Sequence, residues 1–257
     1  MAGHSQFKNI MYRKGAQDAR RAKIFTKLIR EITVAAKMGG GDPAGNPRLR
    51  MAIQNAKGAN MPQDNVTRAI SKGTGDMEGV VYEEFTYEAY GPGGVAILIP
   101  VLTENRNRTG SEVRHILSRR GGNLAEPNAV AWNFEKKAFF LIPGEGVEED
   151  DLLEVVLEAG AENLEPVDGN FEVTSEPEAY EDIRAALEKS VIPAKSAEIT
   201  MLPKTTVKIE GKPAEQMLRL IEALEDNDDV QNVYANFDIS EEETDGDRCN
   251  FPYQQIF

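Results

Sequence analysis

The chain has 257 residues, of which 40% are hydrophobic, and it carries a formal net charge of −14 at pH 7. This length allows a sizeable core, either in one large domain or in two to three small ones. A single cysteine excludes an internal disulfide, and two histidines are too few to complete a cysteine–histidine metal cluster. No apolar run approaches the roughly 18 residues of a membrane-spanning helix, so we expect a cytoplasmic protein.

The charge is unevenly distributed along the chain. Residues 1–78 contain 14 basic and 6 acidic residues, residues 79–144 contain 7 of each, and residues 145–257 contain 8 basic and 30 acidic residues. Between residues 8 and 30 a single acid, Asp18, stands among eight cations: Lys8, Arg13, Lys14, Arg20, Arg21, Lys23, Lys27 and Arg30. Clustered cations of this kind are typical of a site for a polyanion, so nucleic acid is the first hypothesis.

A first helix is predicted over residues 16–38, because Ile24, Leu28 and Ile32 recur at helical spacing. Four of the cations form a row on a face that these apolar residues do not occupy: Arg20, Lys23, Lys27 and Arg30. At 1.5 Å per residue the helix spans roughly 34 Å, so the row can follow a phosphate backbone. The alternative is a solvated helix face, and the asymmetry of charge along the chain favours the binding interpretation.

Two further helices complete a basic N-terminal region. Asn46-Pro47 begins the second helix, which runs to about residue 59, with a capping side chain and a proline at its first position. Met61-Pro62 begins the third helix, which Gly73 is expected to end. Residues 1–78 are therefore predicted to form a nucleic-acid-binding three-helix domain.

The pattern then changes to that of strands. Residues 80–90 and 95–102 are rich in β-branched and aromatic residues, and Gly91-Pro-Gly-Gly94 joins them, which predicts a hairpin. A helix is predicted to follow up to about Arg120, and a strand over residues 129–134 comes after it. Residues 95–134 thus have the order β, α, β.

The next stretch predicts a ferredoxin-like unit. Strands are expected at residues 138–142, near 164, at 171–174 and at 198–202, with helices over 148–159 and 177–189, which is the order βαββαβ. A strand at 206–209, a helix at 213–225 and a strand at 230–237 follow and lack a core of their own. Joined to the β, α, β of residues 95–134, they complete a second such set.

The predicted fold class is α+β, with an N-terminal three-helix domain followed by two ferredoxin-like α/β sandwich domains, one inserted in the other. The predicted domains are residues 1–78, a discontinuous middle domain of residues 79–134 and 204–239, and an inserted domain of residues 135–203. Residues 240–257 are predicted to be an acidic tail.

Eight short motifs occur in order: Met1-Ala-Gly-His-Ser5, Ala16-Gln-Asp-Ala19, Lys23-Ile-Phe-Thr-Lys-Leu-Ile-Arg-Glu31, Gly39-Gly-Gly-Asp-Pro43, Asn46-Pro-Arg-Leu-Arg50, Tyr90-Gly-Pro-Gly-Gly94, Asn105-Arg-Asn-Arg-Thr109 and Gly121-Gly-Asn-Leu124. Together they resemble the YebC/PmpR family over about residues 1–239. The resemblance implies a three-domain cytoplasmic protein without enzymatic activity, of the kind described as a DNA-binding transcriptional regulator. The mitochondrial relative is described as a translational activator, and some bacterial members are placed at the ribosome. DNA and ribosomal or messenger RNA therefore both stay open as the target.

A second nucleic-acid contact is predicted in the helix of the middle domain, at Arg106, Arg108 and Arg114. Arginine can make bidentate contacts with phosphates. A cation at a helix N-terminus opposes the macrodipole, so a partner anion explains the placement better than stability does. The alternative is pairing with Glu104 and Glu112.

No catalytic, cofactor-binding or metal-binding residue is predicted, because the sequence shows no nucleophile–base pair and no set of metal ligands. The competing class is a protein-binding module, in which the acidic half binds a basic protein such as a ribosomal protein or a polymerase subunit. A monomer without membrane association is expected.

Overall fold

The computed structural model describes residues 21–75 and 82–239, apart from the side chains of residues 21 and 22. Its helical region consists of three helices: α2 (Arg21–Gly39), α3 (Pro47–Gly58) and α4 (Gln63–Thr74). Their inward side chains, among them Ile32, Leu49 and Val66, form one buried cluster. The three predicted helices are confirmed from residue 21 onward, and the predicted helical residues 16–20 lie outside the described part of the chain.

Two local features explain how these helices pack. Asn46 caps α3 as predicted: its Oδ1 accepts a hydrogen bond from the N–H of Leu49 at 3.1 Å, and its Nδ2 donates to two backbone carbonyl oxygens at 2.8 Å each. Gly73 does not end α4, contrary to the prediction, but lies inside its last turn. A Cβ there would come 2.3 Å from the carbonyl oxygen of Thr33. The glycine therefore permits the close approach of α4 to α2.

The first sheet has the strand order β3-β1-β2-β9. Its strands are β1 (Glu83–Tyr90), β2 (Ala96–Thr103), β3 (Asn123–Leu124) and β9 (Tyr234–Ala235). β1 and β2 pair antiparallel along their whole length, which confirms the predicted hairpin. The short 3-10 turn η1 (Pro92–Gly94) connects them, with Gly93 and Gly94 at φ values of 74° and 78° that favour glycine.

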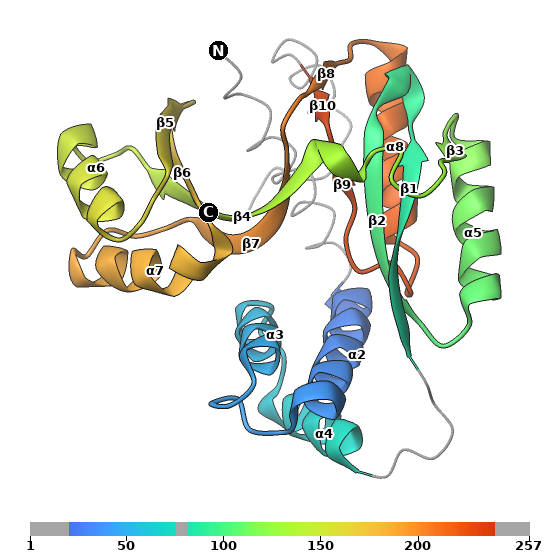
Figure 1. Ribbon diagram of the computed structural model, residues 1–257, viewed down its shortest axis with the longest axis horizontal. Helices are drawn as coiled ribbons and strands as arrows, with labels where there is room; N and C mark the ends of the chain where they lie inside the picture. The colour runs from blue at the N-terminus through green and yellow to red at the C-terminus, as the bar shows by residue number, and fades with distance from the viewer. Residues whose placement is uncertain (1–20, 76–81, 240–257) are drawn as a thin grey trace.

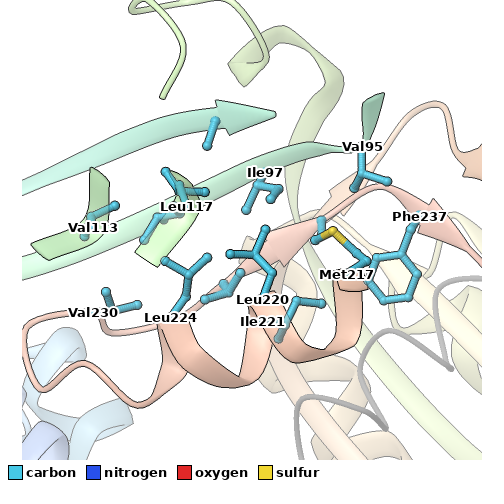
Figure 2. Packing of buried hydrophobic residues seen from close by; sticks show 14 of the residues in the cluster. Val95, Ile97, Val113, Leu117, Met217, Leu220, Ile221, Leu224, Val230 and Phe237 are labelled. Carbon is cyan, nitrogen blue, oxygen red and sulfur yellow. The ribbon is translucent and has the colours of Figure 1, made fainter. Parts of the chain in front are cut away.

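Two helices, α5 (Arg106–Arg119) and α8 (Lys212–Glu225), cover one face of this sheet. Figure 2 shows Val113 and Leu117 of α5 meeting Leu220 and Leu224 of α8 beneath the strands. A separate parallel pair, β8 (Val207–Lys208) and β10 (Phe237–Asp238), lies beside the N-terminal end of α8. The strands predicted at 206–209 and 230–237 are therefore much shorter than expected.

The predicted strand over residues 129–134 is wrong. Residues Ala131–Asn133 form the 3-10 turn η2, and Phe134 begins a strand of the other sheet. The backbone N–H groups of residues 128, 130 and 131 donate to the carboxylate of Glu88, so they take no part in a strand ladder. Val130 and Phe134 are nevertheless buried, because they pack on the face of the first sheet that α5 and α8 leave open.

The second sheet has the order β5-β6-β4-β7 and is antiparallel throughout. Its elements in chain order are β4 (Phe134–Pro143), α6 (Glu149–Glu158), β5 (Asn163–Val167), β6 (Asn170–Ser175), η3 (Pro177–Ala179), α7 (Tyr180–Lys189) and β7 (Ser196–Pro203). This is the ferredoxin-like arrangement predicted for a βαββαβ chain. The first sheet differs from this arrangement. A ferredoxin-like sheet would have β8 between β3 and β2, but β1 lies there and β8 pairs with β10 instead.

The fold class is therefore α+β, with a helical region followed by sheet regions, as predicted (Figure 1). The exact limits of the inserted domain stay a prediction, and the acidic tail lies outside the described residues. The helical region contacts both sheet regions, since Arg48 of α3 pairs with Glu84 of β1 and Met51 packs against the core of the second sheet.

Candidate nucleic-acid interface

The predicted cationic row of α2 lies against residues 225–229, which we call the acidic turn; this segment ends α8 and continues beyond it. Lys23 Nζ donates to Asp226, at 3.1 Å to the carbonyl oxygen and at 3.2 Å to Oδ1. Lys27 Nζ donates to the carbonyl oxygen of Glu225 at 2.6 Å. Two cations of the row therefore hold acceptors that belong to the protein itself.

Arg30 is more enclosed than Lys23, with 16% of its side chain exposed against 44%. Its Nη1 donates to Asp229 Oδ1 at 2.8 Å and to the carbonyl oxygens of Leu102 and Asp228, at 3.0 and 2.9 Å. Arg30 thus joins α2 both to the end of β2 and to the acidic turn.

Asp229 is the centre of this contact, and only 4% of its side chain is exposed. Its Oδ2 accepts hydrogen bonds from Thr109 at 2.6 Å, from Arg108 at 2.8 Å and from Thr103 at 3.1 Å, in addition to the bond of Oδ1 with Arg30. Burial alone would raise the pKa of Asp229, but these donors hold it below its ordinary value. An ionised carboxylate therefore ties α2, β2 and α5 together.

Arg48 makes a second tie between the helical region and the first sheet. Its guanidinium holds Glu31 of α2 through two bonds, Nε–Oε1 at 2.6 Å and Nη2–Oε2 at 2.9 Å, and its Nη1 donates to Glu84 of β1 at 2.8 Å. Hydrogen bonding with Glu31 is the main reason that the pKa of Arg48 is raised, although burial opposes it. The helical region is consequently fixed to the sheet at two places.

The remaining N-terminal candidates cannot be placed in this contact. Lys8, Arg13, Lys14 and Arg20 lie outside the described residues, and Arg21 begins α2 with a side chain that is not described. Lys23, Lys27 and Arg30 already bond with the acidic turn, so a phosphate would compete with it for these cations.

The first two arginines of α5 also have partners within the protein. The Arg106 guanidinium lies 4.5 Å from the ring centroid of Phe85. Arg108 pairs with Asp229 at 2.8 Å and lies 3.8 Å from Glu112, so the pairing alternative holds for Glu112, while sequence reasoning missed the partnership with Asp229. That partnership joins positions 121 residues apart, and no local pattern could reveal it.

The outer side of α5 is different. Arg114, Arg119 and Arg120 are exposed, and no carboxylate among the described residues pairs with them. Sequence reasoning named Arg114 and missed the other two. They stand at the C-terminal end of α5, where cations complement the macrodipole and so have a structural explanation. The structure therefore leaves Arg114, Arg119 and the C-cap residue Arg120 open to solvent along the second half of α5.

The described residues contain no group of three or more histidine, cysteine, aspartate or glutamate side chains arranged to hold a metal ion. Among the same residues, no helix has both the length and the apolar character needed to cross a membrane.

Comparison with known proteins matches nearly the whole described chain to one family. Residues 5–76 match the profile described as the TACO1/YebC protein N-terminal domain, and residues 82–237 match the TACO1/YebC second and third domain. The chain belongs to the TACO1/YebC family.

Similar proteins of this family share most of the chain. A protein of Geotalea uraniireducens, named a probable transcriptional regulatory protein, is 58% identical over 245 residues, which cover 95% of this chain and 99% of the relative. A Geobacter sulfurreducens protein of the same description is 56% identical, with 95% and 98% covered. The crystal structure of a conserved hypothetical protein from Aquifex aeolicus has a TM-score of 0.76 at 45% identity and covers 94% of this chain and 96% of that one. The TACO1/YebC fold of the chain thus agrees with a solved structure.

Proposed function

We propose that the chain is a non-enzymatic regulator of gene expression that acts by binding nucleic acid. The names of its relatives support a role in transcription. The acidic chain as a whole would repel a polyanion, since its net charge is −14, so the contact requires a local concentration of cations.

The observation that carries this proposal is the outer side of α5. Five arginines lie at positions 106–120, against one acid, Glu112. Four of them are exposed without a carboxylate partner among the described residues, and of these Arg106 lies over the ring of Phe85, which leaves Arg114, Arg119 and Arg120. Guanidinium groups bind phosphate with paired hydrogen bonds, and each of these three is open to do so. Of the candidate cations in the described residues, these three are accessible without any rearrangement.

The row of α2 enters the proposal as a second contact. Lys23, Lys27 and Arg30 become available to phosphate if the acidic turn leaves them, and the partly exposed Lys23–Asp226 pair, at 44% and 34%, is the easiest part to exchange. We propose that the cations at positions 8–21 act with this row. Nucleic acid and the acidic turn then compete for the same face of α2.

Both DNA and RNA are candidates for the target. The relatives' names favour DNA and transcription. The exposed side chains favour a contact that holds the backbone, because Arg114, Arg119 and Arg120 carry charge and the row of α2 offers few amide side chains for reading base edges. A ribosome- or RNA-associated translation factor is therefore the second candidate.

The test is binding by the full chain and by a variant in which Arg114, Arg119 and Arg120 are all replaced by alanine. A matched control replaces three cations of the second sheet region, Lys136, Arg184 and Lys189, and so removes the same charge. If each arginine contacts one phosphate, the slope of log affinity against log salt on duplex DNA should flatten by about 2 to 3 in the α5 variant only. Equal effects in both variants would show that net charge, not this surface, governs binding.

The two target classes are separated by competition at physiological salt. A candidate promoter, a random duplex of equal length and purified ribosomes are titrated against one labelled probe. A transcription regulator needs a preference for its promoter of about 1,000-fold or more over the random duplex. Preference for ribosomes with indifference to duplex sequence would instead support the RNA candidate.

A further inference from the structure

The loop over residues 125–133 is held rigidly on the open face of the first sheet. The carboxylate of Glu88 accepts backbone N–H bonds from Asn128 at 2.6 Å, Val130 at 2.7 Å and Ala131 at 2.8 Å. Burial would raise the pKa of Glu88, but these three donors hold it below its ordinary value. In Figure 1 the segment between β3 and β4 crosses in front of this sheet, while α8 lies behind it.

A second anchor holds the other end of the loop. Asn133 is 2% exposed, its Nδ2 donates to the carbonyl oxygen of Thr205 at 3.0 Å, and its Oδ1 accepts from the N–H and the hydroxyl of Thr205 at 3.0 and 2.8 Å. Beneath the loop, Val130 and Phe134 are 1% and 6% exposed and pack on Leu98. The loop therefore has a fixed shape and a buried lower side.

The upper side of the loop presents a tryptophan to solvent. Trp132, the only tryptophan of the chain, is 65% exposed. Its Nε1 donates to the carbonyl oxygen of Ala129 at 3.0 Å, and the hydroxyl of Tyr90, itself 37% exposed, donates to the same oxygen at 3.4 Å. Two exposed aromatic side chains thus share one backbone acceptor, which brings the indole Nε1 and the tyrosine hydroxyl close together.

The residues that flank these rings along the chain carry charges of both signs, with Glu126 in the loop and Arg119 and Arg120 before β3. Val130 of the loop is buried, its three alanines are partly buried, and Pro127 is exposed. The other large apolar side chains that are exposed among the described residues lie elsewhere in the chain: Met38, Leu157 and Val191. Asn123 of β3 pairs with Tyr90, and Arg119 and Arg120 precede β3 by a short turn. A Cβ at Gly122, in that turn, would come 2.8 Å from the carbonyl oxygen of Tyr90, so the turn lies directly against β1.

Exposed aromatic rings together with open cations are features by which proteins bind single-stranded nucleic acid, where bases stack on rings and phosphates meet cations. A protein partner would instead require an apolar patch around the tryptophan, because hot-spot residues lie in desolvated surroundings. We propose that Trp132 and Tyr90 form a stacking site for an unpaired base of a single strand whose phosphates contact Arg119 and Arg120. This inference rests on the proposed function and specifies the strand that the surface accepts.

The test uses the emission of Trp132, which reports on this site alone because the chain has no other tryptophan. The full chain is titrated with single-stranded RNA and DNA of about 12 nucleotides, with an abasic strand of the same length and with a duplex. Stacking on a base should quench the emission with RNA or DNA, and the abasic strand, which keeps the phosphates, should bind more weakly and leave the emission unchanged. Stronger quenching by RNA or by DNA of the same length shows which of the two nucleic acids supplies the stacked base.

Affinity for the same strands is measured separately from the anisotropy of a labelled strand. Trp132→Ala should weaken binding about 5- to 100-fold, as expected for the loss of one stacked base, and Trp132→Phe, which keeps a ring, should retain most of the affinity. Leu157→Ala, an exposed apolar side chain on α6, is the matched control and should change nothing.

The outcomes separate this inference from the proposed function. The stacking site would be overturned, with nucleic-acid binding intact, by two results together: single-stranded nucleic acid binds Trp132→Ala with unchanged affinity, and it does not quench the emission of the wild type. Failure of every nucleic acid to bind would overturn both. Quenching by ribosomal proteins freed of RNA, with no response to any strand, would make the loop a protein contact and refute the assignment to a base.

Discussion

Replacing Asp229 by asparagine should release the helical region from the first sheet, because this carboxylate is the common acceptor for α2, β2 and α5. The amide keeps the shape of the side chain and removes the charge. The guanidinium of Arg30 then loses its anionic partner while only 16% of its side chain is exposed. The cost is that of an enclosed cation whose remaining acceptors, the amide oxygen and two backbone carbonyl oxygens, are all uncharged.

The magnitude follows from exposure. A hydrogen bond between charged groups contributes about 1.5–3 kcal/mol, and the bond with Arg30 should count near the upper end because it is enclosed. The bond with Arg108 should count for less than about 1 kcal/mol, since half of that side chain, 51%, is exposed and can be hydrated again. The expected loss is about 3–4 kcal/mol, within the range for removing one partner of a buried ion pair.

The assay is urea unfolding followed by the emission of Trp132, which reports on the first sheet. At a slope of about 3 kcal/mol per M, the midpoint of Asp229→Asn should fall by about 1 M. Asp228→Asn is the control. The side chain of Asp228 is exposed, and Arg30 bonds only with the backbone carbonyl oxygen of this residue, which the substitution keeps. If the two variants differed by less than about 0.5 kcal/mol, the carboxylate would not be holding the two regions together.

The pH dependence provides an independent check. Since the folded pKa of Asp229 is depressed, its contribution is complete above the unfolded pKa, about 3.9, and is lost as the pH falls through the folded value. The stability difference between the wild type and Asp229→Asn should therefore stay constant from neutral pH to about pH 5 and close below about pH 4.

Three further predictions follow from single observations. Gly73→Ala should destabilise the helical region by about 1–3 kcal/mol, because the new Cβ meets a backbone oxygen. Gly58→Ala, which has open space around the new Cβ, should stabilise α3 by up to about 1 kcal/mol in the same thermal unfolding measurement. Glu88→Gln should loosen the loop, so that hydrogen exchange at residues 128–131 accelerates; exchange as slow as in the wild type would contradict its role as anchor. Residues 134–203 expressed alone should unfold cooperatively, because β4 to β7 close their own sheet and core, while residues 82–133 alone should show no cooperative transition in calorimetry.

Much of the fold could be predicted from local patterns. Helical spacing of Ile24, Leu28 and Ile32 predicted α2, and Asn46-Pro47 marked the beginning of α3, because capping and periodicity act within a few residues. The ferredoxin-like order of the second sheet followed in the same way. Where apolar residues are buried for another reason the pattern misled: Val130 and Phe134 pack on a sheet to which residues 129–133 add no strand. β3, with two residues, is too short to have a pattern.

The candidate interface shows the same division. The sequence alone determined that cations gather in α2 and α5, because charge is a property of each residue. Which of those cations remain open was decided only by the tertiary structure, since the partner of Arg30 stands 199 residues away and that of Arg108 stands 121 residues away. Contacts over such separations depend on how the sheets and helices pack, and the same packing left Arg114, Arg119 and Trp132 facing solvent.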